Sequence, residues 1–328
     1  MKYMYLYEEF KKDNSRVQWL KVNDVESKTD SKIIDELTEM AETQLYDVFY
    51  FNPENIEETF KRKLDNDRPI LRYAGTNPDA GKFIKTQNID KSKIYNKLID
   101  MLLSGNKAKW HRMLGDKEYI PKTVFTKEDA IKELKFPVVA KPSMGHSGVG
   151  IVKFKNSNDL ENDDNTFDIY CQAIDFDSEF RAMFVKDKLV IIYERIPNEE
   201  KNKTIDNKEP DEEVQFIYIE QNLNKFPKIY IDQLNTIVKD FRKYISLECY
   251  SLDFFIDKMG KVWLIESNAA SQLGANSMAV MYEAIYEDYF KKNAPPEKKR
   301  IVKQIVDGYR KEVKGKYEKE FKKSKYPV

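Results

Sequence analysis

The segment that most restricts how this chain folds is a glycine-bearing turn between two short apolar runs. The run FPVVAKP at 136–142 leads through Ser143–Gly150 (SMGHSGVG) directly into IVKF at 151–154. Glycines in such a turn let backbone N–H groups approach an anion closely. Strand, glycine loop and strand predict a hairpin that covers a phosphate, whereas a P-loop leads from a strand into a helix. For this feature alone, a plain hairpin turn remains the alternative.

One charged residue stands at the end of the first apolar run. Lys141 follows VVA and precedes Pro142. An ammonium group in an apolar strand is costly unless it is paired or faces a ligand. This lysine is therefore a candidate contact for an anion.

Acidic and amide side chains gather on a second hairpin, near residue 260. The runs SLDFFID at 251–257 and KVWLIES at 261–267 are joined by a short turn and predict two antiparallel strands. Residues two apart on a strand share a face, so Glu266 and Asn268 point the same way and Asp253 can meet them across the pair. Two carboxylates and an amide oxygen suit Mg²⁺. A solvated acidic edge is the alternative.

Strand-like and helix-like segments alternate along the rest of the chain, which predicts an α/β fold. We expect strands at 46–51 and 69–73 and an antiparallel hairpin over 179–195 that turns at 186–188. The predicted helices cover residues 54–64, 91–103, 107–114, 127–134 and 231–244. The polar stretch at 197–213 predicts a surface loop, either a disordered insertion or a lid over a substrate.

Composition excludes several classes of protein. The chain has 328 residues, of which 41% are apolar, so it can form a large core without disulfides. Its 56 basic and 56 acidic residues balance, which gives no general reason to expect nucleic acid. Two cysteines cannot form a disulfide framework, no apolar run approaches a membrane span, and the N-terminus lacks a secretory apolar segment. We expect a soluble, cytoplasmic protein.

The candidate residues follow one another in a recognisable order. It runs Lys107 in NKAKWHRML, Lys141, Gln172 in CQAI, Glu179 and Arg181 in EFR, Asp253, Glu266 and Asn268. This order resembles the ATP-grasp superfamily, whose ATP-binding domain is like that of glutathione synthetase. The pattern is most similar to the D-alanine–D-alanine ligases and the RimK-like amino-acid ligases. The resemblance covers roughly residues 105–290 and implies an α/β (α+β) fold with two α+β lobes that clamp ATP.

The resemblance implies nucleotide contacts position by position. Lys107 and Lys141 match the two lysines that such enzymes place on the ATP phosphates. The flexible loop over the phosphates corresponds to Ser143, Gly145, His146, Ser147 and Gly148. The linker beside the adenine corresponds to Gln172, Ala173, Ile174 and Asp175, and Glu179 stands at the ribose position.

It also implies metal and catalytic residues. Asp253, Glu266 and Asn268 match the ligands of Mg²⁺, with Mn²⁺ as an alternative ion. Arg181 matches a basic position of the RimK-like branch, and Arg195 ends the next strand near where that branch also has an arginine. With Lys141, these two arginines are the implied catalytic residues.

The chain departs from the family pattern at two places. Gln172 stands where an acidic residue is usual, so backbone carbonyls would read the adenine amino group. Ser271 and Gln272 replace the usual Pro-Gly in the loop that shapes the acceptor site, so the substrate is the least transferable property. His146 either touches a phosphate or faces solvent.

The implied reaction joins a carboxylate to an amine at the expense of ATP, through an acyl phosphate, with release of ADP and phosphate. Such transfer needs positioning and charge neutralisation more than a protein nucleophile. The expected substrates are small-molecule or peptide acids and amines. Two alternatives share the same site residues, namely an ATP-grasp kinase that phosphorylates a small metabolite and a nucleotide-binding regulator without turnover.

The predicted organisation has four contiguous segments. They are an N-terminal α/β domain (1–104), a first lobe with the glycine loop (105–175), a second lobe with the metal site (176–290) and a basic helical tail (291–328). In the family the N-terminal region contributes to substrate binding. Arg72, after the strand PILRY, is either a carboxylate contact or a surface arginine.

The tail carries 14 lysines and arginines against 5 acidic residues. Its larger apolar residues recur every fourth position, at Ile301, Ile305, Tyr309, Val313, Tyr317 and Phe321. This spacing predicts one apolar face on a charged helix. The face either docks on the body of the protein or recruits an acidic peptide, protein or RNA.

Overall fold

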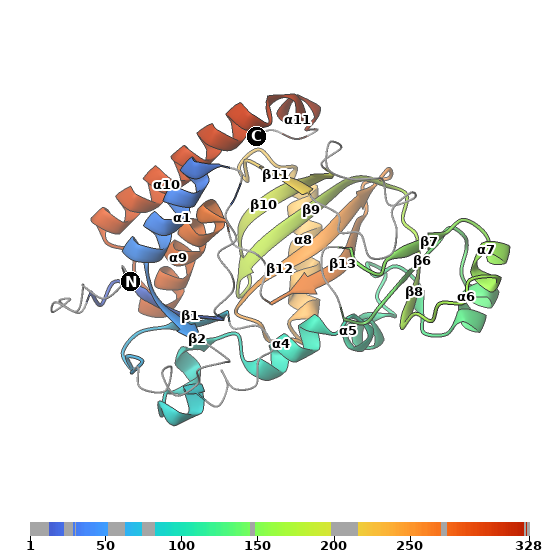
Figure 1. The fold of residues 1–328 in the computed structure, drawn as a ribbon, viewed down its shortest axis with the longest axis horizontal. Coiled ribbons are helices and arrows are strands. Elements are labelled where there is room, and N and C mark those ends of the chain that lie inside the picture. Colours follow the sequence, from blue (N-terminus) through green and yellow to red (C-terminus); the bar gives the residue numbers. More distant parts are fainter. Residues whose placement is uncertain are drawn as a thin grey trace. The chain divides into compact units, whose positions relative to one another are not determined.

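The computed structural model divides into two compact units. It describes residues 13–22, 29, 31–51, 63–73, 83–144, 148–197, 216–269, 274–324 and 326. The first unit comprises residues 1–95 and 273–309, and the second comprises 96–272 and 310–328. Both units are discontinuous in sequence, whereas the predicted segments are contiguous. Each unit is described in turn (Figure 1).

A parallel four-stranded sheet in the order β2-β1-β3-β4 organises the first unit. Its strands are β1 (Val17–Val22), β2 (Tyr46–Phe51), β3 (Ile70–Tyr73) and β4 (Ile94–Tyr95), and a short 3₁₀ helix (Lys91–Lys93) precedes β4. Parallel neighbours need a crossover, and α1 (Lys32–Gln44) supplies the one between β1 and β2. The predicted strands at 46–51 and 69–73 are therefore confirmed as β2 and β3.

Helix α1 packs against the C-terminal part of the same unit. Its start is capped by Ser31, whose hydroxyl accepts a hydrogen bond from the Ile34 N–H at 3.3 Å. Helix α9 (Ala275–Phe290) and the first part of α10 (Pro296–Lys316) lie beside α1 (Figure 1). A Cβ atom at Gly308 of α10 would lie 3.2 Å from the methyl carbons of Leu37, so a larger residue there would require the Leu37 side chain to shift by a few tenths of an ångström.

The second unit begins with two short helices and a small sheet. Helices α4 (Leu98–Gly105) and α5 (Lys107–Leu114) come first. The antiparallel sheet β5-β8-β6-β7 contains β5 (Thr123–Val124), β6 (Val138–Lys141), β7 (Val152–Phe154) and β8 (Ile169–Gln172). Helices α6 (Lys127–Glu133) and α7 (Ser157–Glu161) belong to the same lobe. This lobe contains the predicted strand, glycine turn and strand as β6 and β7.

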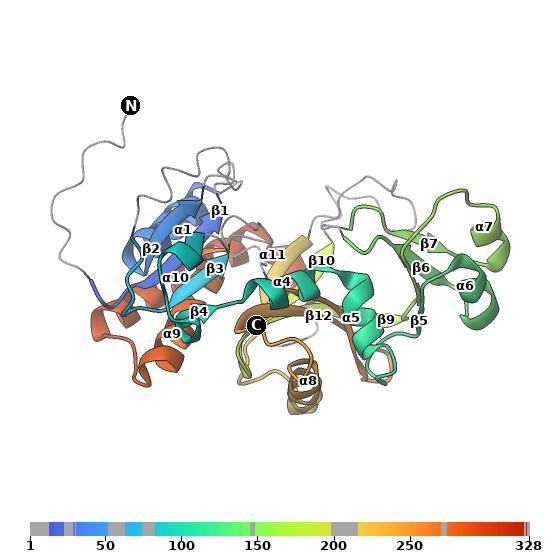
Figure 2. The same cartoon turned by 90° about the horizontal axis from the view of Figure 1, so that it is seen from below.

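A larger antiparallel sheet, in the order β11-β10-β9-β12-β13, forms the other lobe of this unit. Its strands are β9 (Phe176–Val185), β10 (Lys188–Pro197), β11 (Phe216–Glu220), β12 (Cys249–Asp257) and β13 (Val262–Asn268). Helix α8 (Lys228–Phe241) lies against one face (Figure 2). Apolar residues that alternate along β9 and β12, such as Phe180 and Phe254, pack with Phe241 of α8 in the core. Polar side chains occupy the opposite face of this five-stranded sheet.

The helix predicted over 91–103 is wrong in its first half. A 3₁₀ turn and β4 occupy residues 91–95, and α4 begins only at Leu98. Asn96 explains the break, because it adopts a left-handed backbone conformation (φ 68°). Its buried amide donates to the carbonyls of Cys249 and Ala269, at 2.5 and 3.0 Å. These long-range bonds outweigh the local helical preference. The helix predicted at 54–64 lies almost wholly outside the described residues.

The basic tail is helical, as α10 and then α11 (Glu318–Lys323). Of its predicted apolar stripe, Ile305 and Val313 are fully buried. In the second unit, Arg310 donates two hydrogen bonds to the Glu220 carboxylate, at 2.9 and 2.6 Å. These contacts favour the expectation that the stripe docks on the protein itself.

Among the described residues, no helix combines the length and apolarity that a membrane crossing requires.

Candidate active site

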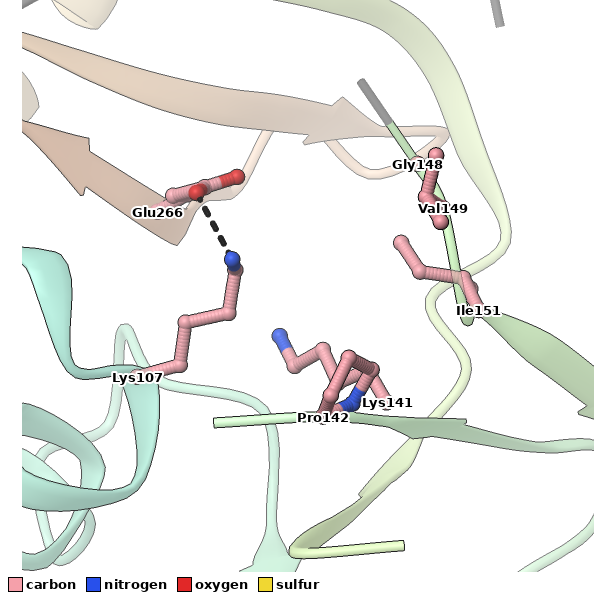
Figure 3. Close-up of a pocket in the computed structure, with 7 residues that line it drawn as sticks. All are labelled: Lys107, Lys141, Pro142, Gly148, Val149, Ile151 and Glu266. Carbon is pink, nitrogen blue, oxygen red and sulfur yellow. Dashed lines mark ion pairs between the residues drawn. The ribbon is translucent and has the colours of Figure 1, made fainter. Parts of the chain in front are cut away.

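A small pocket in the second unit brings together residues from both of its lobes. It is lined by Lys107, Lys141, Pro142, Gly148, Val149, Ile151 and Glu266. Figure 3 shows the two ammonium groups reaching into the same space, Lys107 from α5 and Lys141 from the end of β6, with Glu266 of β13 beyond Lys107. Lys107, Lys141, Gly148 and Glu266 were all predicted as site residues from widely separated motifs.

Hydrogen bonds hold the elements that carry the two lysines. Asn106 caps α5, because its side chain accepts from the Lys109 N–H at 2.9 Å. The N–H of Lys107, in the first turn of α5, donates to the carbonyl of Ser143 at 2.8 Å. Ser143 in turn donates its own N–H to the carboxylate of Asp168 at 2.7 Å. The start of α5 and the turn after β6 are thereby joined.

The two lysines differ in how their charges are balanced. Both are only 7% exposed. The ammonium nitrogen of Lys107 lies 3.1 Å from Oε1 of Glu266. Lys141 has neither a hydrogen bond nor an ion pair for its ammonium group within the described part of the chain. The pocket therefore has an uncompensated positive charge.

The turn between β6 and β7 passes beside Lys141. Gly148 and Gly150 adopt left-handed conformations with φ of 76° and 74°, which favour glycine. A Cβ atom at Gly150 would also lie 3.1 Å from the ring of Pro142. Gly145, His146 and Ser147, predicted as phosphate contacts, lie outside the described residues.

Beside this pocket, the five-stranded sheet carries a cluster of four charged residues: Glu179, Arg181, Arg195 and Asp253. The cluster follows from strand register. Arg181 of β9 lies opposite Asp253 of β12, which lies opposite Glu266 of β13. The predicted meeting of Asp253 and Glu266 across a strand pair is thus confirmed. Arg195 arrives from β10, on the other side of β9.

Three short hydrogen bonds fix the Asp253 carboxylate. Arg181 donates from Nε to Oδ1 and from Nη2 to Oδ2, both at 2.7 Å. Arg195 donates from Nη1 to Oδ2 at 2.9 Å, and the same Nη1 lies 2.6 Å from Oε1 of Glu179. All four side chains are largely buried, and Asp253 is 2% exposed. The cluster joins two guanidinium groups and two carboxyl groups.

Burial and charge act in opposite directions on these acids. Burial raises the pKa of Glu179 to about 7, although Arg195 lowers it. Burial also acts to raise the pKa of Asp253, but Arg181 and Arg195 outweigh it and hold that pKa below its ordinary value. The pKa of each arginine is raised, because Asp253 overcomes the effect of burial. Both guanidinium groups therefore remain charged.

Two aromatic residues of β11 complete the cluster, and sequence reasoning missed both. The guanidinium carbon of Arg195 lies 3.9 Å from the centroid of the Phe216 ring. Tyr218 lies opposite Arg195 in the strand register, and its hydroxyl lies 3.4 Å from Nη1 of Arg181. The alternation FIYIE at 216–220 was the available signal, because it predicts a strand whose aromatic residues share a face.

A buried histidine lies behind the two lysines. His111, one turn after Lys107 on α5, is 1% exposed and stacks on Trp110 at 4.0 Å. Its Nδ1 lies 3.3 Å from the hydroxyl of Thr123, and its Nε2 has no hydrogen-bond partner in the described structure. Burial, followed by the charges of Lys141 and Lys107, holds the pKa of His111 well below 6.5. The ring is neutral at physiological pH.

The predicted adenine linker connects the two lobes of this unit. Gln172 ends β8 and donates its N–H to the Lys122 carbonyl at 2.9 Å, and Ala173 donates to the Pro137 carbonyl at 3.0 Å. Ile174 is half-buried. Asp175 is exposed and pairs with Lys258 at 2.7 Å. Ser271 and Gln272 of the acceptor loop lie outside the described residues.

The three predicted metal ligands differ in their availability. Glu266 is 28% exposed and lines the pocket. The side-chain amide of Asn268 makes no hydrogen bond to the described residues. Both offer oxygen atoms, which suit Mg²⁺. Asp253 instead has both oxygens bound by arginines. Within the described ranges, no group of three His, Cys, Asp or Glu side chains is arranged to hold a metal ion.

Arg72 of β3 is buried, so it is not the surface arginine of the alternative reading. Burial lowers its pKa from the ordinary value. It belongs to the first unit, whereas the pocket residues belong to the second.

Comparison with known proteins adds evidence on the fold. No protein-family model matches the sequence, and no curated protein matches it significantly. Among solved structures, the D-alanine–D-alanine ligase of Bacillus anthracis superposes with a TM-score of 0.56 at 14% identity, over 90% of this chain and 99% of the ligase. The ATP complex of that ligase gives a TM-score of 0.54 at 15% identity, over 92% and 99% of the two chains.

Two further ligases have the same arrangement. The L-amino acid ligase of Bacillus licheniformis gives a TM-score of 0.52 at 17% identity, over 85% of this chain and 72% of that one. The ATP-grasp ligase PsnB, solved with a minimal precursor, gives 0.53 at 12% identity, over 83% and 98%. With the two-lobed architecture and the ordered site residues, these likenesses show that the chain has the ATP-grasp fold.

Proposed function

We propose that this protein is an ATP-dependent carboxylate–amine ligase that forms an amide bond through an acyl phosphate and releases ADP and phosphate. One observation carries the proposal. Lys141 is a nearly buried cation without a partner among the described residues, and it lines a pocket that also contains Lys107 and Glu266. A buried ammonium group is costly unless an anion meets it. The site is therefore suited to an anionic ligand.

The geometry around Lys141 favours phosphate as that anion. The turn at Gly148 and Gly150 brings main chain close to the lysine, and backbone N–H groups in such turns bind phosphate oxygens. Lys107 supplies a second cation at the start of α5, where the helix terminus also favours negative charge. ATP binding also agrees with the ATP complex among the structures that share this fold.

The chain's own groups account for most of what phosphoryl transfer requires. Lys107 and Lys141 orient the phosphates and neutralise their charge, which lowers the barrier when a substrate carboxylate attacks the terminal phosphorus. Glu266 and Asn268 would hold Mg²⁺, or Mn²⁺ in its place. When bound, the ion neutralises further phosphate charge. Arg181 and Arg195 lie beside this site, where they pair with Asp253 and Glu179.

The second step needs little from the protein beyond position. The acyl phosphate that the transfer produces has an activated carbonyl carbon. An amine held beside it attacks that carbon, the C–O bond to phosphate breaks, and phosphate leaves. The ligases that share the fold include one for D-alanine and one for L-amino acids, so an amino acid or a short peptide is the first acceptor to test.

The decisive experiment measures ADP release by the purified protein with ATP and Mg²⁺. Pools of amino acids, dipeptides and acidic peptides serve as substrates, with mass spectrometry of the products. We expect ADP release that depends on an amine acceptor, together with a new amide. Lys141→Met should abolish it. Lys155→Met, which changes an exposed lysine after β7, is the matched control and should leave it unchanged.

Other outcomes would point elsewhere. A stable product heavier by one phosphoryl group would make the protein a kinase. ATP binding without ADP release from any pool would instead favour a regulatory nucleotide-binding protein. Equal activity of Lys141→Met and the Lys155→Met control would contradict the role given to the pocket.

A further inference from the structure

We propose that in this chain Asp253 anchors an arginine pair instead of binding the metal, so that the protein's contacts to the metal fall to Glu266 and Asn268. The inference rests on the proposed function, because it concerns the metal that accompanies ATP. It departs from the assignment that the sequence pattern implies, in which all three residues are ligands.

The first support is the hydrogen bonding of the Asp253 carboxylate. Arg181 and Arg195 together donate three bonds of 2.7 to 2.9 Å to its two oxygens. A carboxylate has about four lone-pair positions, so one position on Oδ1 is left. The Asp253 side chain, which carries this remaining lone-pair position, is only 2% exposed. A metal would have to replace an arginine or enter a nearly closed space.

The second support is electrostatic. Protein oxygens bind Mg²⁺ at about 2.1 Å, so an ion on Asp253 would lie within roughly 5 Å of two guanidinium groups. Burial weakens the screening of that repulsion. The corresponding cost is smaller at Glu266, because its ion pair is with one ammonium group, that of Lys107 at 3.1 Å, whereas Asp253 pairs with two guanidinium groups. Glu266 is also far more exposed, at 28%.

The third support is the location of the pocket. Glu266 is part of its lining, whereas Asp253 is not among the described residues that line it. The two carboxylates lie opposite each other on β12 and β13, but their ion-pair partners differ. Glu266 turns to the lysines of the pocket (Figure 3), and Asp253 bonds to arginines of β9 and β10.

The arrangement makes Asp253 a positioning residue. Arg195 bonds to both Asp253 and Glu179, and Arg181 bonds to Asp253 in the two-point geometry that best fixes a guanidinium plane. Neither arginine is free to follow a moving substrate. Asp253 therefore acts on the reaction by keeping both positive charges at fixed points of the sheet.

Mn²⁺ binding separates an anchor from a ligand. Electron paramagnetic resonance counts free Mn²⁺ in titrations of the full chain with the non-hydrolysable β,γ-imido analogue of ATP. We expect Glu266→Gln to weaken Mn²⁺ binding at least tenfold and Asp253→Asn to weaken it less than threefold. Asp253→Asn should lower the melting temperature by about 5 °C or more, because it weakens the pairing of two buried arginines.

Two further variants complete the experiment, one as a matched control and one as a replacement for Asp253→Asn. Asp187→Asn removes a carboxylate that is 70% exposed and lies 2.8 Å from Arg242, and it should leave both readouts unchanged. The double variant Asp253→Leu/Arg181→Met removes opposite charges together and leaves the Arg195–Glu179 pair intact. It should melt closer to the original protein than Asp253→Asn does and should still bind Mn²⁺. It replaces Asp253→Asn if that variant does not fold.

A tenfold loss of Mn²⁺ affinity in both folded Asp253 variants would overturn the inference and restore Asp253 as a ligand. An unchanged melting temperature of Asp253→Asn would equally overturn the anchor. Failure of the proposed function gives a different result, namely no acceptor-dependent ADP release by the original protein, while the Mn²⁺ titrations and the melting temperatures would still report on Asp253.

Discussion

The buried arginines of the second unit and its buried Lys141 differ in how their charges are balanced. Arg181 and Arg195 meet carboxylates at distances of 2.9 Å or less. Lys141, buried to a similar degree, meets no anion among the described residues. Both groups lie at the ends or on the polar face of β-sheets, so the fold does not by itself dictate whether a buried cation is paired.

The difference separates the two tasks of a positive charge in a protein. A paired arginine contributes to the structure that surrounds it, and removing either partner exposes the cost of burying the other. An unpaired lysine lowers stability in the absence of ligand and regains that free energy when an anion binds. Removing Lys141 should therefore weaken binding without harming the fold, and removing Arg181 should do the reverse.

The largest expected effect is the loss of stability on removing Arg181. Arg181→Met leaves the buried Asp253 with a single arginine, and we expect the free energy of unfolding to fall by about 3 kcal/mol. Chemical denaturation measures it. Arg310→Met is the matched control, because Arg310 makes the same two-point contact to Glu220 but is 55% exposed. It should cost less than about 1 kcal/mol, and equal losses would refute the comparison.

The next effect concerns the lysine. We expect Lys141→Met to weaken ATP binding about 100-fold, or about 2.7 kcal/mol, because the phosphates lose a desolvated cation. Unfolding without nucleotide should show stability that is unchanged or raised. Calorimetric titration and denaturation of the same preparation measure both quantities. A destabilised variant with normal affinity would show that Lys141 has a structural partner after all.

Much of this contrast could be predicted from local sequence. The cost of burying a lysine at the end of VVAK predicts from sequence alone that Lys141 contacts an anion. The two-residue period of strands and the short turn after Asp257 also predicted the meeting of Asp253 with Glu266, which the register of β12 and β13 contains. Both inferences use residues within one hairpin or one strand.

The partners of Asp253 could not be predicted in the same way. Arg181 is 72 positions away and Arg195 is 58 positions away, and their contact depends on β9 lying between β10 and β12. The order of strands in the sheet cannot be predicted from the local spacing of polar and apolar residues. The break at Asn96 has the same origin, because its hydrogen bonds reach Cys249 and Ala269. Sequence reasoning therefore found the acids and bases of the site but not which of them are already paired.

The buried His111 near the two lysines should make the stability of the protein depend on pH. Its pKa is held well below 6.5 by burial and by Lys141 and Lys107, so below about pH 6.5 the unfolded chain binds a proton that the folded chain does not. Stability therefore falls as the pH drops. The loss should be on the order of 1 kcal/mol by pH 5.5. His111→Asn keeps a hydrogen-bonding group for Thr123 and should show a flatter pH dependence than the original protein between pH 7.5 and 5.5. An equally steep dependence would contradict this assignment.

The smallest expected effect concerns the contact between the Phe216 ring and Arg195. Phe216 lies under the guanidinium group of Arg195 at 3.9 Å, and such a contact contributes about 0.5 to 1 kcal/mol. Phe216→Leu should lower the free energy of unfolding by about that amount more in the original protein than in an Arg195→Met background. Phe176→Leu, which removes a ring stacked on Phe255, is the control and should cost the same in both backgrounds. Equal losses for Phe216→Leu would mean that the ring acts only by covering apolar surface, and that the carboxylates alone hold Arg195.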